Sequence, residues 1–284
     1  MSLDVLEFHR RTNHTYASVR RRSRGLDWSN KPDPFKEYPD LPLVDLPAPR
    51  QARPPLEPGR LTRESLAHIL YYGAGITRVR EFDGDRFDFR AYASAGALYP
   101  IEVYAIVGDL EDLKAGVYHY HPKHHALRAL REGDLRGFLN AATANDSAIA
   151  RAPVTLVLTG IPWRTMWKYE ARGYRHLYWD GGMILANLFE VCEPIEVPAE
   201  LRLGFVDEAV DWLLGLDGRH ELSLALVALG RGPTVIGRAE DLPSIEPRVE
   251  PLSRREIEYP DALAVHDASS LRSVTEVGRW KSSR

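Results

Sequence analysis

The chain has 284 residues and a formal net charge of −3, and 44% of its residues are hydrophobic. This composition is typical of a globular protein with a large core, and the charge does not favour a general nucleic-acid binder. The basic run at residues 20–24 is short, and we interpret it as a solvated loop. The N-terminus lacks the apolar segment of a signal peptide, and no apolar run approaches the roughly 20 residues that span a bilayer, so we expect a cytoplasmic protein without a membrane segment.

Proline content divides the chain into three parts. Residues 27–60 are rich in proline, which cannot continue a helix and fits poorly in a central strand, so we expect residues 1–60 to form an extended arm. The aromatic residues Trp28, Phe35 and Tyr38 suggest that this arm docks on a surface. Residues 61–232 form the expected core, and residues 233–284 an extended, again proline-rich tail. An arm and a tail of this length suggest wrapping around a partner subunit.

The core mixes helical and strand patterns, which predicts an α+β fold. Thr62 is placed to cap a helix that stops at Gly73 and Gly75. Apolar side chains at three- and four-residue spacing predict a longer helix over 174–192, in which Cys192, the only cysteine, is expected to be buried and unreactive. The other predicted elements are a helix at 207–216, strands at 101–107, 153–161 and 222–230, and a hairpin of 116–121 with 125–130.

The segment RAYASAGALYP, from Arg90 to Pro100, is the first candidate binding site. Its Ser-Ala-Gly-Ala centre is small enough for backbone amides to come close to a ligand. Ser94 adds a hydroxyl that can donate or accept, and Arg90 adds a fixed positive charge suited to a phosphate or a flavin carbonyl edge. A tight loop without a ligand fits the same residues equally well.

The segment WKYEARGYRHLYWDGG, from Trp167 to Gly182, is the second candidate. Lys168 and Tyr169 are adjacent in it, with two arginines close by. A lysine can act as a base where burial or neighbouring cations disfavour its charged form. A solvated, charged helix entrance fits the same pattern, and the residues alone favour that interpretation.

Four histidines crowd into the expected hairpin: His119, His121, His124 and His125. A zinc or iron site is conceivable because His119 and His121 share a strand face. No cysteine or carboxylate cluster accompanies them, and the turn at Pro122 directs them to water, so we expect a solvated hairpin and no metal site. The chain also lacks a GxGxxG fingerprint, which excludes dinucleotide binding by a Rossmann fold.

Taken in order, these segments resemble the SagB-type dehydrogenases, a branch of the FMN-dependent nitroreductase-like superfamily. The similar pieces are LDWSNKPDPFKEYPDLP, LAHILYYGAGIT, RAYASAGALYPIEVYAIV, GVYHYHPKHHALRAL, WKYEARGYRHLYWDGGMILANL and DEAVDWLLGLDGRHELSLALVALG, which extend from Leu26 to Gly230. The resemblance implies a nitroreductase-like FMN-binding fold with a central mixed or antiparallel sheet flanked by helices. It also implies a homodimer in which both subunits contribute to each FMN site.

The resemblance assigns roles to particular residues. The expected FMN contacts are Arg90, Ser94, Ala95 and Gly96, with Leu98 and Tyr99 shaping the loop. The family often holds the FMN phosphate with an Arg-Arg-Ser motif, which is not intact here, so the phosphate candidates are Arg50, Arg53 and, by position after the last core strand, Arg231. A surface arginine explains Arg231 equally well. In the azole-forming members an adjacent lysine and tyrosine act in catalysis, and Lys168 and Tyr169 match that pair.

The sequence departs from the family pattern at three places. Ala93 stands where the family usually has proline, which makes the loop less rigid. Gly181 stands where the family often has histidine, and together with Gly182 it suggests close approach of something flat or bulky to the helix. The stretch PIEVPAELRLGF replaces a more glycine-rich loop.

The function expected from the resemblance is an FMN-dependent dehydrogenase or oxidase that converts a peptide-derived azoline ring to an azole in natural-product biosynthesis. A cyclodehydratase partner is left open. One alternative is an NAD(P)H-dependent nitro- or quinone reductase, but such an enzyme needs no substrate base and so leaves Lys168 and Tyr169 unexplained. The other is a non-catalytic, flavin-free dimeric scaffold, against which Arg90, Ser94 and Gly96 argue.

Overall fold

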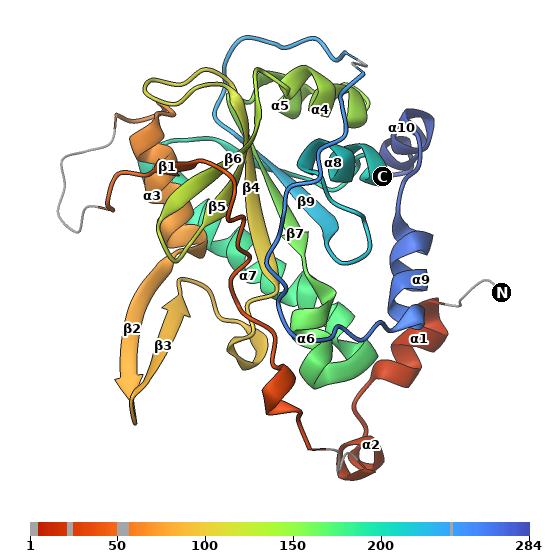
Figure 1. Ribbon diagram of the computed structural model, residues 1–284. Helices are drawn as coiled ribbons and strands as arrows, with labels where there is room; N and C mark the ends of the chain where they lie inside the picture. The colour runs from red at the N-terminus through yellow and green to blue at the C-terminus, as the bar shows by residue number, and fades with distance from the viewer. Residues whose placement is uncertain (1–4, 22–24, 50–56, 239–240) are drawn as a thin grey trace.

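The computed structural model describes residues 5–21, 25–49, 57–238 and 241–284, and its centre is a large antiparallel sheet (Figure 1). The sheet has seven strands in the order β1-β6-β5-β4-β7-β9-β8, and each neighbouring pair is antiparallel. The strands are β1 (Leu43–Asp45), β4 (Ile101–Val107), β5 (Gly116–His121), β6 (Ala126–Glu132), β7 (Val154–Gly160), β8 (Ala199–Arg202) and β9 (Leu222–Leu229). The predicted α+β fold is confirmed, and of the two expected sheet types the antiparallel one is present.

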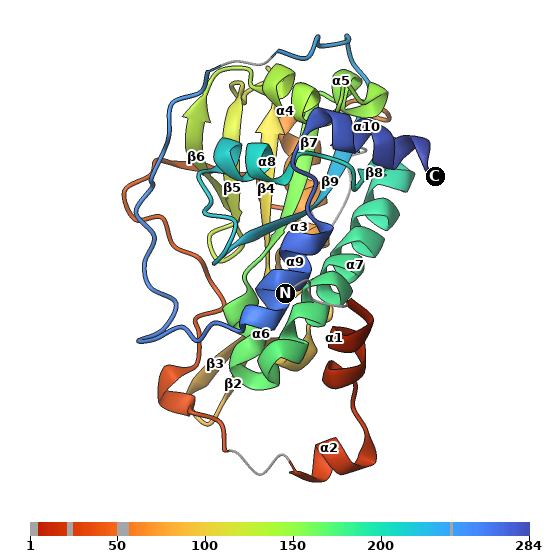
Figure 2. The ribbon, with the colours of Figure 1, turned by 90° about the vertical axis from the view of Figure 1, so that its right-hand side faces the viewer.

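Helices cover both faces of this sheet (Figure 1, Figure 2). α3 (Arg63–Ala74) and α7 (Gly173–Cys192) pack on one face, and α4 (Arg136–Ala142), α5 (Ser147–Arg151) and α8 (Asp207–Leu214) pack on the other. Strand alternation explains the two layers, because β4 sends Val103 to the first face and Tyr104 to the second. Within the described ranges, no helix combines the length and apolar character that a membrane span requires.

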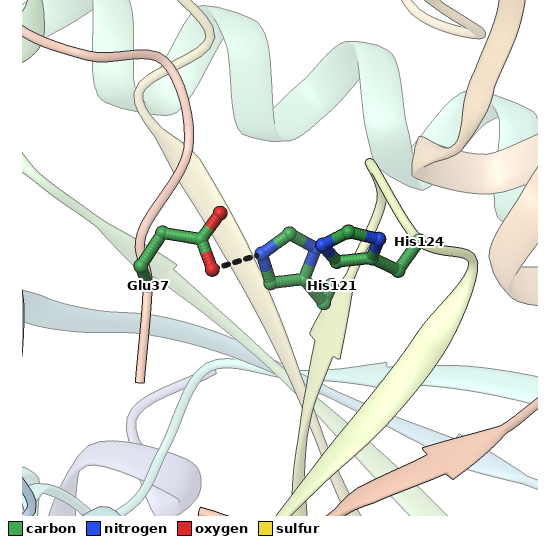
Figure 3. Close-up of side chains that lie close together, drawn as sticks. All are labelled: Glu37, His121 and His124. Atoms are coloured by element: carbon green, nitrogen blue, oxygen red, sulfur yellow. Dashed lines mark ion pairs between the residues drawn. The ribbon is translucent and has the colours of Figure 1, made fainter. Parts of the chain in front are cut away.

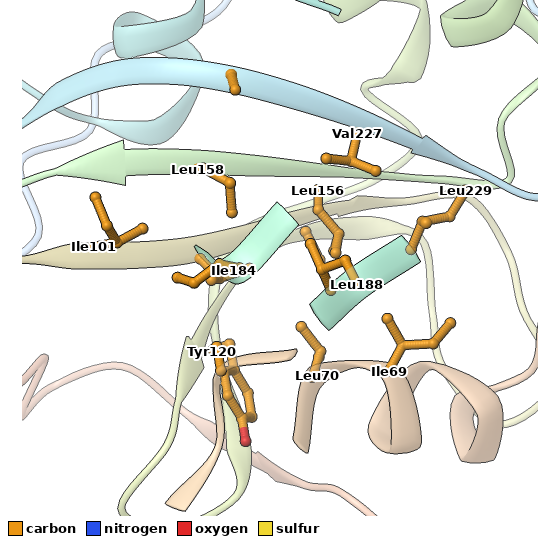
Figure 4. Close-up of a cluster of buried hydrophobic side chains, with 14 of the residues drawn as sticks. Ile69, Leu70, Ile101, Tyr120, Leu156, Leu158, Ile184, Leu188, Val227 and Leu229 are labelled. Carbon is orange, nitrogen blue, oxygen red and sulfur yellow. The ribbon is translucent and has the colours of Figure 1, made fainter. Parts of the chain in front are cut away.

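The larger core lies between the sheet and the helix pair α3 and α7 (Figure 4). Its labelled members are Ile69 and Leu70 from α3, Ile184 and Leu188 from α7, and Ile101, Tyr120, Leu156, Leu158, Val227 and Leu229 from the strands. Gly73 allows α3 to approach α7, because a Cβ at this position would lie 2.6 Å from Leu188 Cδ2. Each fully buried leucine stabilises the fold by about 1.5–3 kcal/mol, so this layer fixes where α7 lies.

The predicted core elements are confirmed, within a residue or two at each end. Thr62 caps α3 and accepts a hydrogen bond from the Ser65 amide, and Cys192 is buried, which raises the pKa of its thiol to about 12. The prediction missed β8 and a separate two-stranded hairpin of β2 (Ile76–Phe82) and β3 (Asp85–Arg90). The signal for that hairpin was the dipeptide Asp83-Gly84, whose residues both have positive φ, at 51° and 84°.

The prediction that the two ends are extended throughout is wrong. The N-terminal part contains α1 (Val5–Thr12) and α2 (Tyr16–Arg21), and the tail contains α9 (Pro260–Ser269) and α10 (Val274–Ser282). The physical reason is the position of the prolines: the chain has none before Pro32, and Pro260 occupies the first turn of α9, where its fixed φ suits a helix start. The proline-rich stretch between α2 and α3 is irregular where it is described, apart from β1 and one short 3-10 turn.

The arm, residues 25–49, docks on its own core through buried polar groups. Lys36 Nζ lies 2.5 Å from Glu221 Oε2 and donates to the Tyr104 hydroxyl at 2.9 Å. The Tyr38 and Tyr104 hydroxyls are hydrogen-bonded to each other at 2.9 Å. Because both charged side chains are almost fully buried, removal of either would leave an unpaired charge inside the protein. The arm is therefore an integral part of the fold of this chain.

Candidate active site

The loop between β3 and β4 carries the first predicted motif in a strained backbone. Gly96 has φ +69°, and the non-glycine residues Ala97 and Tyr99 also have positive φ, at 52° and 45°. Such conformations persist only where the surroundings enforce them, and they concentrate at functional sites. Gly96 and Ala97 are exposed, while Leu98 is buried beneath them. The loop thus presents a small-residue surface outward on a packed base.

Asp180 of α7 holds this loop in place. The Ser94 hydroxyl donates to Asp180 Oδ2 at 2.5 Å, and the Ala95 amide donates to Asp180 Oδ1 at 3.3 Å. The Tyr99 amide in turn donates to Ser94 Oγ at 2.9 Å. Burial raises the pKa of Asp180, and the hydrogen bonds from Ser94 and Ala95 act in the opposite direction. Asp180 was not among the predicted site residues, because its partners are more than 80 residues away in sequence.

The second predicted motif meets the first at Gly96. Lys168 and Tyr169 end α6 (Pro162–Tyr169), and a Cβ built on Gly96 would lie 3.0 Å from Lys168 Nζ and 3.0 Å from Tyr169 Oη. Any side chain at position 96 would therefore occupy the space that these two groups face. Glu170, the next residue, has φ 54°, so strained backbone lies on both sides of the junction. The structure brings Gly96, Lys168 and Tyr169 together.

A buried ion pair fixes α6 relative to the loop. Arg164 stands one turn before Lys168, is fully buried, and its Nη1 donates to Glu102 Oε1 of β4 and, at 2.9 Å, to the carbonyl of Tyr99. Its Nε donates to the carbonyl of Asp33 in the arm at 3.0 Å. Burial alone would raise the pKa of Glu102, but Arg164, His119 and Arg90 together outweigh burial and hold that pKa well below its usual range. One arginine therefore joins helix, loop, strand and arm.

Arg90 lies behind the loop. It is buried, and its guanidinium donates to the carbonyl oxygens of Pro34 and Ile101. The same group lies over the rings of Phe35 and Tyr99, at 5.4 Å and 5.0 Å from their centroids. These contacts fasten the arm to the base of the loop, and the predicted FMN contact of Arg90 stays a prediction.

Arg231, the phosphate candidate that lies within the described residues, is not beside the loop. Arg231 is exposed, and its Nη2 lies 3.7 Å from Glu200 Oε1 at the far end of β9. The sheet register places the loop at the opposite end, where Ile101 pairs with Gly160, which in turn pairs with Leu222. The length of β9 separates the two ends by roughly 20 Å. Arg50 and Arg53 lie outside the described residues.

His176 of α7 is a site residue that the sequence reasoning missed. Its ring lies between Tyr169, at a centroid distance of 4.2 Å, and Trp179, at 4.9 Å. Burial, followed by the nearby Arg172, lowers the pKa of His176 to about 4, so the ring is neutral at pH 7. The spacing from Tyr169 across the break between α6 and α7 gave no sequence signal. The His176 ring thus packs, inclined by 34°, against one member of the predicted catalytic pair.

Open space adjoins this junction on two sides. Lys168 lines a cavity of about 140 Å³ between the arm, α6 and the segment before α9; its other walls include Asp27, Trp167, Arg255 and Tyr259. A Cβ on Gly181 or Gly182 would meet nothing within 4 Å, so α7 offers a flat surface there. Two larger cavities, of about 410 Å³ and 500 Å³, are lined by none of the predicted site residues.

The histidine hairpin is not solvated as a whole, so that prediction is wrong. His119 and His121 are fully buried, because the arm covers this side of β5: Tyr38 packs edge-on against His119, and Phe35 stacks on His121. His119 Nε2 lies 2.7 Å from Glu102 Oε2, which connects the hairpin to the Arg164 ion pair. Of the four histidines, only His124 is exposed.

The residues at the junction fit a flat, hydrogen-bonding cofactor such as a flavin. Gly96 provides a cradle that a Cβ would fill, with Lys168 and Tyr169 at its edge and no side chain of the loop in the way. Ser94, Ala95 and Gly96 could hold such a ring system through backbone groups, and the neutral, stacked His176 adds an aromatic wall. Chemically, the arrangement can bind a planar ring and move a proton at Lys168 Nζ.

Comparison with known proteins finds a match to the nitroreductase family and three similar proteins. The nitroreductase family profile matches residues 51–231. MJ1384 of Methanocaldococcus jannaschii, which carries the name of a nitroreductase, is 29% identical over 60% of this chain and 81% of its own length. The microcin B17-processing protein McbC of Escherichia coli is 31% identical over 50% of this chain and 54% of its own length. The trifolitoxin-processing protein TfxB of Rhizobium leguminosarum bv. trifolii is 33% identical over 61% of this chain and 48% of its own.

Solved structures agree on the fold. The crystal structure of a nitroreductase from Anabaena variabilis aligns with a TM-score of 0.78 and 27% identity over 96% of this chain and 55% of that chain. A chain of the E. coli microcin synthetase McbBCD complex aligns with a TM-score of 0.53 and 22% identity over 81% of this chain and 87% of that chain. The chain thus spans about half the length of McbC, TfxB and the Anabaena protein.

The hydrogen bonds that Asp180 accepts from the loop can be tested without any ligand. Asp180→Ala removes the acceptor of the Ser94 hydroxyl and the Ala95 amide, so we expect faster hydrogen exchange of the Ala95 amide and a loss of about 1–3 kcal/mol in the free energy of unfolding. Exchange followed by NMR and denaturant titration measure both effects. The control Asp267→Ala, at an exposed helix position, should change stability by less than about 0.5 kcal/mol. Unchanged protection at Ala95 in Asp180→Ala would mean that the loop holds itself.

Proposed function

This chain belongs to the nitroreductase family, and we propose that it is an FMN-dependent dehydrogenase or oxidase that converts a peptide-derived azoline ring to an azole. The observation that carries the proposal is the meeting of Gly96 with Lys168 and Tyr169. A small-residue loop alone suits any flavoprotein of this fold. A lysine and a tyrosine at its edge add a group that can take a proton from a substrate lying on the flavin.

Two relatives support the substrate class. McbC and TfxB carry the names of processing proteins for microcin B17 and trifolitoxin, and both exceed 30% identity with this chain over at least half of its length. We therefore place the substrate among thiazoline- or oxazoline-containing peptides of natural-product biosynthesis.

The chemistry divides between the cofactor and the protein. Oxidation of an azoline ring removes a proton from one carbon and a hydride from another, and FMN, when bound, supplies the hydride acceptor. In the proposal, Lys168 Nζ takes the proton, and Tyr169 orients the lysine or shares that proton. Asp180 keeps Ser94 and Ala95 in position, where they would hold the ring system. Arg90 acts on the site by fastening the arm behind the loop.

Lys168→Ala separates binding from chemistry. We expect the variant to keep its flavin absorbance and to oxidise substrate about 10²–10⁴-fold more slowly, because that is the usual contribution of a positioned base. The assay is loss of two hydrogens from a synthetic thiazoline peptide, followed by mass spectrometry. Lys114→Ala, an exposed lysine away from the junction, is the matched control and should retain full turnover.

The same assay distinguishes the alternatives. Undiminished thiazoline oxidation by Lys168→Ala would sink the assignment of the base. If the protein does not oxidise thiazolines but reduces quinones or nitroaromatics with NAD(P)H, it is a general reductase of the family. A purified chain without flavin absorbance, and without any after FMN is added, is a scaffold.

We further propose that two copies of this chain pair through α7. The outer face of this helix carries Trp179, Met183 and Phe189, which are 51%, 43% and 36% exposed; Trp179 and Met183 are one helical turn apart. Gly182 lies on the same face and leaves it flat. The β2–β3 hairpin adds exposed Phe82 and Phe87. Exposed apolar side chains of this kind mark an interaction site, and a second copy would cover this face of α7.

Met183→Glu tests the pairing. The side chain is half-exposed in one protomer, so the substitution should leave folding intact while it places a charge inside the proposed dimer interface. We expect light scattering to report the mass of one chain in place of two, with loss of bound flavin. Ile236→Glu, at a position 75% exposed in the tail, should remain dimeric and yellow. A dimer that tolerates Met183→Glu would exclude this face of α7 as the interface.

A protein partner belongs to the same proposal. The relative of this chain in the McbBCD complex is solved as part of a microcin synthetase with a truncated precursor bound. We propose that this chain likewise receives its azoline substrate from a cyclodehydratase, because that reaction class produces the ring that is oxidised here.

A further inference from the structure

We propose that Glu37, His121 and His124 bind a divalent transition-metal ion, for which Zn²⁺ is the best match to the donors. Glu37 comes from the arm, His121 from the end of β5 and His124 from the following turn. One ligand atom of each residue lies within 4.8 Å of the other two. Figure 3 shows His121 between the other two side chains, with the Glu37 contact drawn as a dashed line. The site is separate from the proposed flavin chemistry.

The donor set is the reason for choosing zinc. Two imidazole nitrogens and one carboxylate oxygen form one of the common three-ligand sets for zinc, which leaves a fourth position to water. The carboxylate is the donor that the sequence pattern lacked, because Glu37 is more than 80 residues from both histidines. The fold supplies it by laying the arm across β5.

His121 is the buried member of the three proposed metal ligands. It is fully buried, its Nδ1 has no hydrogen-bond partner among the described residues, and its Nε2 is paired with Glu37. Its Nε2 lies 2.8 Å from Glu37 Oε2, close enough for both atoms to share one ion. A buried imidazole nitrogen next to a carboxylate oxygen, with a second imidazole close by, is a donor arrangement that a metal ion can bridge. The stacked Phe35 ring, inclined by 10°, keeps His121 in this orientation.

His124 is the adjustable member of the set. It is exposed, and its ring centroid lies 4.7 Å from that of His121. Zinc holds its nitrogen and oxygen ligands at about 2.0–2.2 Å, so the His124 nitrogen must come closer to the other two donor atoms to join them on one ion. Rotation of the exposed His124 side chain and a small movement of Glu37 can supply that change without moving the buried His121.

Two cations now neutralise Glu37. Lys123 Nζ lies 4.0 Å from Glu37 Oε1, and Arg128 Nη2 lies 4.0 Å from Glu37 Oε2. An incoming Zn²⁺ competes with these positive charges. Lys123 is half-exposed and can turn into solvent, whereas Arg128 is also held by the carbonyl of Leu41. Removal of the charge at Lys123 should therefore strengthen metal binding, which is a result that a chance cluster of histidines does not predict.

The consequence of metal binding is a fixed arm. Phe35 stacks on His121 and lies under the Arg90 guanidinium, so the metal site and the base of the loop share one aromatic ring. The ion would join the arm to the β5–β6 turn by coordination bonds, next to the Lys36–Glu221 pair. A ligand that binds only the folded state stabilises it, so zinc should raise the melting temperature.

The experiment measures zinc binding by the full chain with its bound flavin. Chelator-treated protein is dialysed against Zn²⁺ and its metal content determined, and affinity is measured by competition with a chromogenic chelator. We expect one zinc bound through this site, at least about tenfold weaker binding in His124→Ala and in Glu37→Gln, and tighter binding in Lys123→Gln. His9→Ala, another exposed histidine, should bind like the wild type. Zinc should raise the melting temperature of the wild type but not of His124→Ala.

Because His124 is exposed, its replacement leaves the fold intact, and a loss of zinc in that variant reports on coordination alone. The proposal is overturned if the wild-type chain retains no zinc after dialysis. It is also overturned if His124→Ala and Glu37→Gln bind zinc as tightly as the wild type. Neither outcome depends on flavin content or on turnover, so the result stands apart from the proposed oxidase function.

Discussion

The arrangement of the site depends on one buried ion pair, between Arg164 of α6 and Glu102 of β4, whose side chains are 0% and 1% exposed. A buried charge is tolerated only with a partner and further hydrogen bonds, and here the carbonyls of Tyr99 and Asp33 and the ring of His119 supply them. Because Arg164, together with His119 and Arg90, outweighs burial and keeps the pKa of Glu102 well below its usual range, the pair stabilises the fold at neutral pH and loses this contribution in strong acid.

The position of the pair explains how two motifs far apart in sequence become neighbours. Tyr99 belongs to the small-residue loop, and Lys168 follows Arg164 by one helical turn, so fixing Arg164 against Tyr99 brings Lys168 to Gly96. Asp33 belongs to the arm, so its hydrogen bond with Arg164 holds the proline-rich segment against the core. The arm in turn covers the β5 face and carries Glu37 to His121. The flavin-site proposal and the metal-site proposal thus rest on the same docked arm.

Sequence patterns predicted the core well because its strands and helices are defined by local periodicity. The capped helix after Thr62 and the buried strand at Val154–Gly160 needed no long-range information. The loop and the Lys168–Tyr169 pair were found because the resemblance preserves residue types at fixed spacing. Asp180, His176 and the carboxylate of Glu37 were not, because their roles come from contacts that only the folded chain creates. The histidine hairpin was wrongly predicted to be solvated for the same reason, because the arm that buries it is distant in sequence and gives no local signal.

The most direct test of this account is a double-mutant cycle on the ion pair, with Arg164→Met, Glu102→Gln and the double variant. Each single variant should lose about 3–5 kcal/mol of unfolding free energy and release FMN more readily, because one buried charge is left without its partner. The double variant should lose much less than the sum of the two. Additive losses, or single variants that keep wild-type stability and flavin affinity, would contradict the claim that this pair holds the loop and α6 together.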